Sequence, residues 1–90
     1  MDRPVELTVY GPLRAATGEK RVRVAPDGET VRAVVEAFVA AYPRAASHLV
    51  DEAGDLRPSV RVTVDGERAS LDDDCPPDAD VALFPAMRGG

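Results

Sequence analysis

Several residue types that build catalytic and metal sites are scarce in this chain of 90 residues. It contains one cysteine, one histidine and no tryptophan. A single cysteine excludes an intramolecular disulfide and a metal site made of several cysteines. We therefore expect a protein of a reducing, cytoplasmic compartment with no metal site of its own.

Long apolar stretches are missing as well. No apolar run approaches the ~18 residues that a membrane span requires. The N-terminal MDRPVE also lacks a basic region followed by an apolar one, which a secretory signal would have. The sequence predicts neither a membrane protein nor a secreted one.

Positive charge is in deficit. Eleven Lys and Arg residues stand against sixteen Asp and Glu, which gives a net charge of -5 at pH 7. Such a chain is not expected to bind the phosphates of nucleic acids. Lys20 is the single lysine among the basic residues, so self-linked chains through a lysine side chain could use only that position.

What is present is typical of one small globular domain. The chain is 44% hydrophobic and 30% charged, well above the apolar content below which chains stay disordered. Its length allows one core and not two. We expect residues 1–85 to form this domain and residues 86–90 to form a flexible tail.

The N-terminal part of the sequence predicts a hairpin. Residues 5–10 alternate between apolar and polar side chains, which is typical of a half-buried strand with Val9 on its inner face. Residues 20–24 alternate in the same way. Because Gly11-Pro12 is a turn signal, we expect a short loop up to Gly18 between the two strands.

One main helix is predicted next. Thr30 is suited to cap its N-terminus, apolar residues recur at helical spacing as far as Tyr42, and Pro43 stops it. Its β-branched valines lower the helix propensity, so the helix should depend on packing against a sheet. Residues 44–58 predict one short helical turn and an exposed loop.

Strands return in the C-terminal half. Residues 59–64 and 81–84 alternate, and Asp65-Gly66 is a type I′ turn signal that leads into a short polar edge strand around Arg68. The order of elements predicts an α+β fold, in which a mixed sheet of about four to five strands packs on one main helix.

The last five residues, AMRGG, differ from the rest. They span at most roughly 17 Å when extended, and the two glycines have no side chain to clash with the walls of a narrow tunnel. A free carboxylate on Gly90 is ionised at neutral pH and is a poor electrophile. Acyl chemistry at Gly90 would therefore need an activating partner.

The order of elements, the segment RPSVRVTVDGE and the end DADVALFPAMRGG resemble the ubiquitin-like β-grasp sulfur carriers over nearly the whole chain. That family includes the small subunit of molybdopterin synthase, the thiamine-pathway carrier, the carriers of cysteine and thiosugar synthesis, and the small archaeal modifiers. The most specific element is the diglycine a few residues beyond a strand and a proline. The resemblance implies a ubiquitin-like β-grasp fold.

The resemblance also implies a function for Gly90. An E1-like adenylating enzyme would use ATP and Mg to activate its carboxylate, which becomes a thiocarboxylate and delivers sulfur to an enzyme that makes molybdopterin, cysteine, a thiosugar or a similar metabolite. The chain itself would be a co-substrate without a bound cofactor, not an enzyme, and a monomer when alone. Two alternatives are a protein modifier joined through Gly90 to target lysines, and a β-grasp interaction module that is never conjugated.

The tail departs from the family in part. Gly89 would give clearance beside Gly90, and partners would recognise Met87 and Arg88, where the family commonly has small apolar residues. An arginine directly before the diglycine, as at Arg88, resembles the C-terminus of ubiquitin. The excursion over residues 43–58 is more similar to the molybdopterin and cysteine carriers than to the thiamine carrier.

A docking face is predicted on the outer side of the sheet. If the first, third and last strands are neighbours, Tyr10 and Phe84 form an aromatic patch with Arg14, Arg61, Thr63 and Arg68 around it. Apolar patches with a polar rim commonly mark protein contacts. The resemblance implies that the activating enzyme docks here; the alternative is that the chain's own tail covers Phe84.

The remaining reactive residue types favour structural roles. Ser47 and His48 are adjacent, and adjacent residues rarely align as nucleophile and base. Cys75 is predicted to be an inert loop thiol, with a redox or thioester role as the alternative. The carboxylates of residues 72–74 project in different directions, which favours a solvated turn over a cation site.

Overall fold

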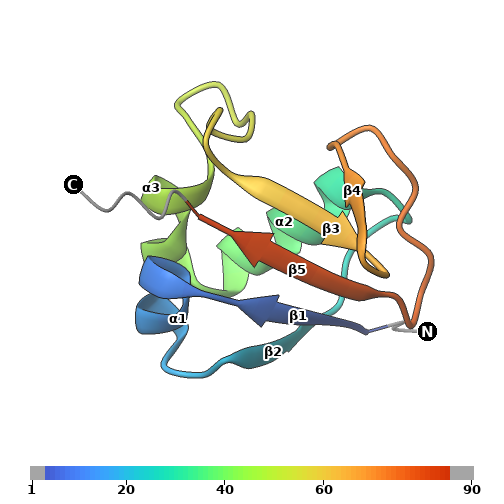
Figure 1. Cartoon of the computed structure of the whole chain (residues 1–90), viewed down its shortest axis with the longest axis horizontal. Coiled ribbons are helices and arrows are strands. Elements are labelled where there is room, and N and C mark those ends of the chain that lie inside the picture. Colours follow the sequence, from blue (N-terminus) through green and yellow to red (C-terminus); the bar gives the residue numbers. More distant parts are fainter. Residues whose placement is uncertain (1–3, 86–90) are drawn as a thin grey trace.

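The computed structural model describes residues 4–85 of the chain (Figure 1). A five-stranded sheet forms one layer, and the helices lie together on one side of it (Figure 1). The strand order is β2-β1-β5-β3-β4. The strands are β1 (Val5–Val9), β2 (Arg21–Val24), β3 (Arg61–Val64), β4 (Glu67–Ala69) and β5 (Asp80–Phe84).

The sheet is mixed, as predicted. β1 pairs antiparallel with β2 and parallel with β5, and β5 pairs antiparallel with β3. β3 and β4 form the predicted hairpin, and Asp65 and Gly66 both have positive φ (52° and 85°), as a type I′ turn requires. β4 is the short edge strand that the sequence predicted around Arg68.

Alternation along the strands separates a buried face from an open one. On the inner face, Leu7, Val9 and Leu83 are each 0% exposed, and β1 and β5 both show the expected alternating pattern. No polar or charged residue is buried among residues 4–85. The core is therefore an apolar layer between the sheet and the helices.

The main helix, α2 (Val31–Ala41), forms the other side of this core. The side chain of Thr30 accepts a hydrogen bond from the backbone N–H of Ala33 at 3.2 Å, so the predicted cap is confirmed. Phe38 is 0% exposed beneath the sheet. The helix ends before Pro43, as the sequence predicted.

The predicted loop between β1 and β2 is wrong, because residues Gly11–Thr17 form the helix α1. Gly11 has a positive φ of 55° and turns the chain out of β1. Pro12 lies in the first turn, where its missing N–H leaves no helical hydrogen bond unmade. Leu13 fills the core and is 0% exposed, which anchors the helix.

The excursion after α2 follows the prediction of a short helical turn and a loop. It consists of a 3₁₀ turn, η1 (Pro43–Ala45), the helix α3 (Ala46–Leu49), and a loop closed by an isolated bridge between Val50 and Leu56. In residues 4–85, no helix is both long enough and apolar enough to cross a membrane.

Candidate functional site

An aromatic pair marks one end of the open face. Tyr10 directly follows β1 and Phe84 ends β5, and their rings stack with centroids 4.9 Å apart and planes 9° from parallel. They meet because β1 and β5 are parallel neighbours whose register pairs Val9 with Leu83. Both side chains are half-buried, so the pair presents ring surface to solvent beside the strand ends.

Arg61 and Thr63 lie next to this pair on β3. Arg61 is the cross-strand partner of Phe84, and Thr63 is the partner of Ala82. Their side chains point to the open face because Val62 between them points into the core. The structure therefore brings Arg61 and Thr63 together with the aromatic pair, as the sequence predicted for neighbouring strands.

Arg14 reaches the same end of the sheet from α1. Its backbone N–H donates to the carbonyl of Tyr10 at 3.4 Å, so it lies about one helical turn beyond Tyr10. The side chain is exposed. The sequence predicted Arg14 on a loop, whereas the helix α1 holds it. A place for its side chain in the docking face stays a prediction.

A hollow of about 300 Å³ lies beside the aromatic pair. Ser59, Arg61, Phe84 and Pro85 line it. Sequence reasoning did not include Ser59 or Pro85 in the site. Ser59 was predicted as the start of the strand over residues 59–64, but it lies in a turn just before β3. Pro85 is the last described residue, so the hollow lies where the chain continues towards the diglycine.

The tail positions of the predicted site are Met87, Arg88, Gly89 and Gly90. They lie outside the described residues. The arrangement of residues 4–85 bears on the docking face alone, and its role in docking stays a prediction.

Cys75 does not belong to this face. It lies in the core and is 1% exposed. Burial raises the pKa of the Cys75 thiol, and the negative charge of Asp65 adds to the effect. A buried thiol that resists ionisation is a poor nucleophile, which supports the structural role predicted for Cys75.

The acidic run 72–74 holds the start of α2. The carbonyl of Asp73 accepts the backbone N–H of Val31 at 2.9 Å, and its carboxylate accepts the N–H of Ser70 at 2.8 Å. Asp72 pairs with Arg32 at 3.5 Å on the surface. In the described part of the chain, no group of three or more His, Cys, Asp or Glu side chains could hold a metal ion.

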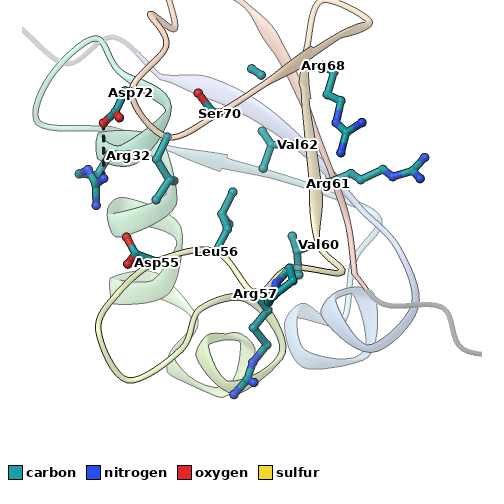
Figure 2. Close-up of a pocket in the computed structure, with 13 residues that line it drawn as sticks. Arg32, Asp55, Leu56, Arg57, Val60, Arg61, Val62, Arg68, Ser70 and Asp72 are labelled. Atoms are coloured by element: carbon teal, nitrogen blue, oxygen red, sulfur yellow. Dashed lines mark hydrogen bonds and ion pairs between the residues drawn. The ribbon is translucent and has the colours of Figure 1, made fainter.

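A second hollow, of about 400 Å³, lies beneath β3 and β4 on the side of the helices. Leu56, Val60 and Val62 contribute apolar surface to it, and the ion pair between Arg32 and Asp72 spans one edge (Figure 2).

Ser47 and His48 do not line this hollow. The carbonyl of Ser47 accepts a hydrogen bond from Nε of Arg57 at 2.8 Å. Residue 47 therefore helps to fix the excursion.

Known proteins are similar to this chain in sequence and in fold. The profile of the ThiS family matches residues 7–90. Small archaeal modifier protein 1 of Haloferax volcanii is 32% identical over 87 residues, which are 96% of this chain and 100% of the relative. The match therefore covers nearly all of both proteins.

Solved structures agree with this relationship. The crystal structure of the Haloferax volcanii protein has a TM-score of 0.88 and covers 97% of this chain and 99% of its own. A chain of the Amycolatopsis orientalis BexX/CysO complex is 25% identical, with a TM-score of 0.78 over 96% of this chain and 99% of its own. The protein described here therefore belongs to the ThiS family and has the ubiquitin-like β-grasp fold of sulfur carriers and small protein modifiers.

Proposed function

We propose that the protein is a sulfur carrier that is charged at the carboxylate of Gly90. The observation that carries this proposal is the family match, which runs to residue 90 and so includes Gly89 and Gly90. The alignment with the archaeal relative spans the whole length of that relative. Gly90 is thus the proposed acyl residue, and Gly89 gives it clearance in a narrow active site.

The proposed chemistry takes place on an activating enzyme that binds ATP and Mg²⁺. A carboxylate oxygen of Gly90 attacks the α-phosphorus of ATP, and pyrophosphate leaves. A hydrosulfide donor then attacks the acyl carbon, AMP leaves with the electron pair of the broken C–O bond, and loss of one proton gives the thiocarboxylate. Attack on the free carboxylate would have to expel an oxide ion, and AMP is a far better leaving group. This explains the need for activation.

The described domain fits the role of a co-substrate. Its one thiol, Cys75, is buried, and its pKa is raised, so it is poorly suited to act as the sulfur nucleophile. The partner enzymes would supply the reactive groups. A free thiol is also compatible with the reducing cytoplasm that we propose as the location.

The position of the aromatic pair supports docking at the tail. Tyr10 and Phe84 lie at the end of the sheet where the chain passes through Pro85 towards residue 90. A partner that contacts this end would sit within reach of the tail, because five extended residues span roughly 17 Å. We therefore propose that Tyr10, Arg14, Arg61, Thr63 and Phe84 contact the activating enzyme, and that Met87 and Arg88 enter its channel.

Intact-mass measurement tests the proposal. The protein is incubated with the adenylating enzyme of its host, ATP, Mg²⁺ and sulfide, and the expected product is heavier by the replacement of one oxygen with sulfur. Deletion of Gly90 should abolish this product. A variant with one alanine added after Gly90 moves the carboxylate away from the diglycine and should fail as well. An unmodified carboxylate with an active enzyme present would contradict the proposal.

Conjugation to proteins is a second candidate function. It is favoured by the name of the relative that is 32% identical, a small archaeal modifier protein. Trypsin cleaves after arginine, so cleavage at Arg88 would leave Gly89-Gly90 on a modified lysine. Diglycine-bearing lysines in digests of host proteins, lost when Gly90 is deleted, would support a modifier. If no such lysines are found and the thiocarboxylate product is formed, the modifier function is rejected and the carrier function is supported.

A further inference from the structure

The charged side chains on the open face follow the register of the strands. Cross-strand partners define three rows across the sheet, one at the start of β1, one in the middle and one at the tail end. The first row holds Arg23, Glu6 and Asp80; the middle row holds Arg21, Thr8, Ala82, Thr63 and Arg68; the row at the tail end holds Tyr10, Phe84 and Arg61.

The tail end of the face is basic and aromatic. Arg61 lies beside Phe84, and Arg68 follows one row behind it on the edge strand β4. Figure 2 shows the two guanidinium groups on the same side, pointing away from apolar Leu56 and Val62. Within residues 4–85 neither arginine forms an ion pair. Two unpaired positive charges thus stand together on a protein whose net charge is -5.

The opposite end of the face is acidic. Glu6 and Asp80 are direct cross-strand partners. With Asp78 and Arg23 they line a hollow of about 290 Å³. The one ion pair of Glu6 in the described structure joins it to Arg21 at 3.6 Å, and both side chains are well exposed, so solvent screens it. The acidic end keeps net negative charge.

From this division we propose that the activating enzyme presents carboxylates opposite Arg61 and Arg68. The inference rests on the proposed function and names the chemistry of the partner surface. The division of charge also sets the direction of docking. In the productive orientation, carboxylates of the enzyme meet the two arginines while the tail end faces the adenylation site. Rotation of the carrier by half a turn about the centre of β5 would put Glu6 in the place of Arg61 and Arg21 in the place of Arg68. The carboxylate opposite Arg61 would then face a like charge, and like charges repel.

Arginine is well suited to this contact. Its planar guanidinium can bind a carboxylate through two parallel hydrogen bonds, and it stays charged at any physiological pH. Ser59 lines the same hollow as Arg61 and offers a hydroxyl donor there. A carboxylate of the enzyme that enters the hollow beside Phe84 could therefore accept hydrogen bonds from both residues.

Steady-state kinetics with the host's adenylating enzyme test the inference. The assay is ATP–pyrophosphate exchange at several concentrations of the full-length carrier. Arg61→Glu should raise KM for the carrier by about tenfold at low salt and leave kcat unchanged, because charges at an interface rim act mainly on encounter. Arg61→Gln should give a smaller rise. Both effects should shrink as the salt concentration increases.

Arg44→Glu is the matched control. It changes the net charge by the same amount, and Arg44 is an exposed residue of η1, away from the open face. Its KM should equal that of the wild type. Thermal unfolding followed by circular dichroism identifies any variant that has lost its fold, and Arg61→Gln then remains as the milder test.

The outcomes separate the inference from the function beneath it. If the wild type supports no exchange, the proposed function fails and takes the inference with it. If the wild type is active and Arg61→Glu and Arg44→Glu share its KM, the inference alone is overturned. An unchanged KM, together with loss in Arg61→Glu of a concentration-dependent dimer seen by sedimentation, would assign the face to a second copy of the chain instead.

Discussion

The two faces of the sheet use alternate residues of the same strands, yet their chemistry is opposite. On β5, Leu83 is 0% exposed in the core, whereas its neighbour Phe84 stacks on Tyr10 at the surface. The inner face is apolar, and the outer one carries arginines and carboxylates in ordered rows. Folding therefore depends on one face and recognition on the other, so substitutions should separate the two properties.

The largest expected effect is on the inner face. Leu83→Ala should lower the free energy of unfolding by about 2–5 kcal/mol, because it removes buried methyl groups and leaves a cavity in the central strand. Urea unfolding monitored by circular dichroism measures the change. A loss below about 1 kcal/mol would mean that the core collapses around the site and that packing here is looser than the burial indicates.

One residue further along the strand, at Phe84, a substitution should affect recognition more than stability. Phe84→Ala should lower the free energy of unfolding by roughly 1 kcal/mol, because the ring contact with Tyr10 is lost. When both variants are assayed under conditions in which they are folded, Phe84→Ala should raise KM for the carrier in adenylation more than Leu83→Ala does. Phe84→Leu is the matched control, since it keeps apolar volume and removes the stacking. Equal KM values for Phe84→Ala and the wild type would remove Phe84 from the docking face.

Local pattern alone predicted most of this division. Alternation assigned Val9 to the core and Tyr10 to the surface, and the Thr30 cap and the Asp65-Gly66 turn follow from side-chain chemistry within a few residues. Such features depend on neighbours in the chain, so one sequence is enough to predict them. The family resemblance, carried by the C-terminal segment, supplied the functional hypothesis.

Features that depend on contacts between distant segments could not be predicted in the same way. The meeting of Tyr10 and Phe84 requires β1 and β5 to lie in parallel, and the sequence could state this only as a condition. The helix α1 was missed because Leu13 is its one buried residue, which leaves no apolar stripe to detect, and because Gly11-Pro12 is a turn signal as well as a helix start. The contact of Asp73 with Val31 likewise joins distant segments.

The buried thiol of Cys75 makes the stability of the core depend on pH. Burial, with a smaller contribution from Asp65, raises the pKa of Cys75 above the ordinary value of 9.0. The folded state therefore holds this proton more tightly than the unfolded chain. The stability contributed is fully present below pH 9 and should be lost as the pH rises through the folded value.

Unfolding free energies of the wild type and Cys75→Ala, compared from pH 8 upwards, measure this contribution. The two proteins differ at residue 75 alone, so the difference in slope belongs to Cys75. A steeper decline in the wild type is expected. Parallel curves would mean that solvent reaches the thiol, and its assignment as an inert core group would then be wrong.

The smallest effect should come from the outer ion pair. Arg21 and Glu6 are 3.6 Å apart, and their side chains are 69% and 38% exposed. Arg21→Ala should therefore cost about 0.5 kcal/mol or less, a change no larger than that of Arg23→Ala in the neighbouring row. A loss well above 1 kcal/mol for Arg21→Ala alone would show that charges on the open face contribute to folding. Kinetic effects of Arg61→Glu would then reflect a weakened domain as well as a weakened contact, and the separation of the two faces would fail.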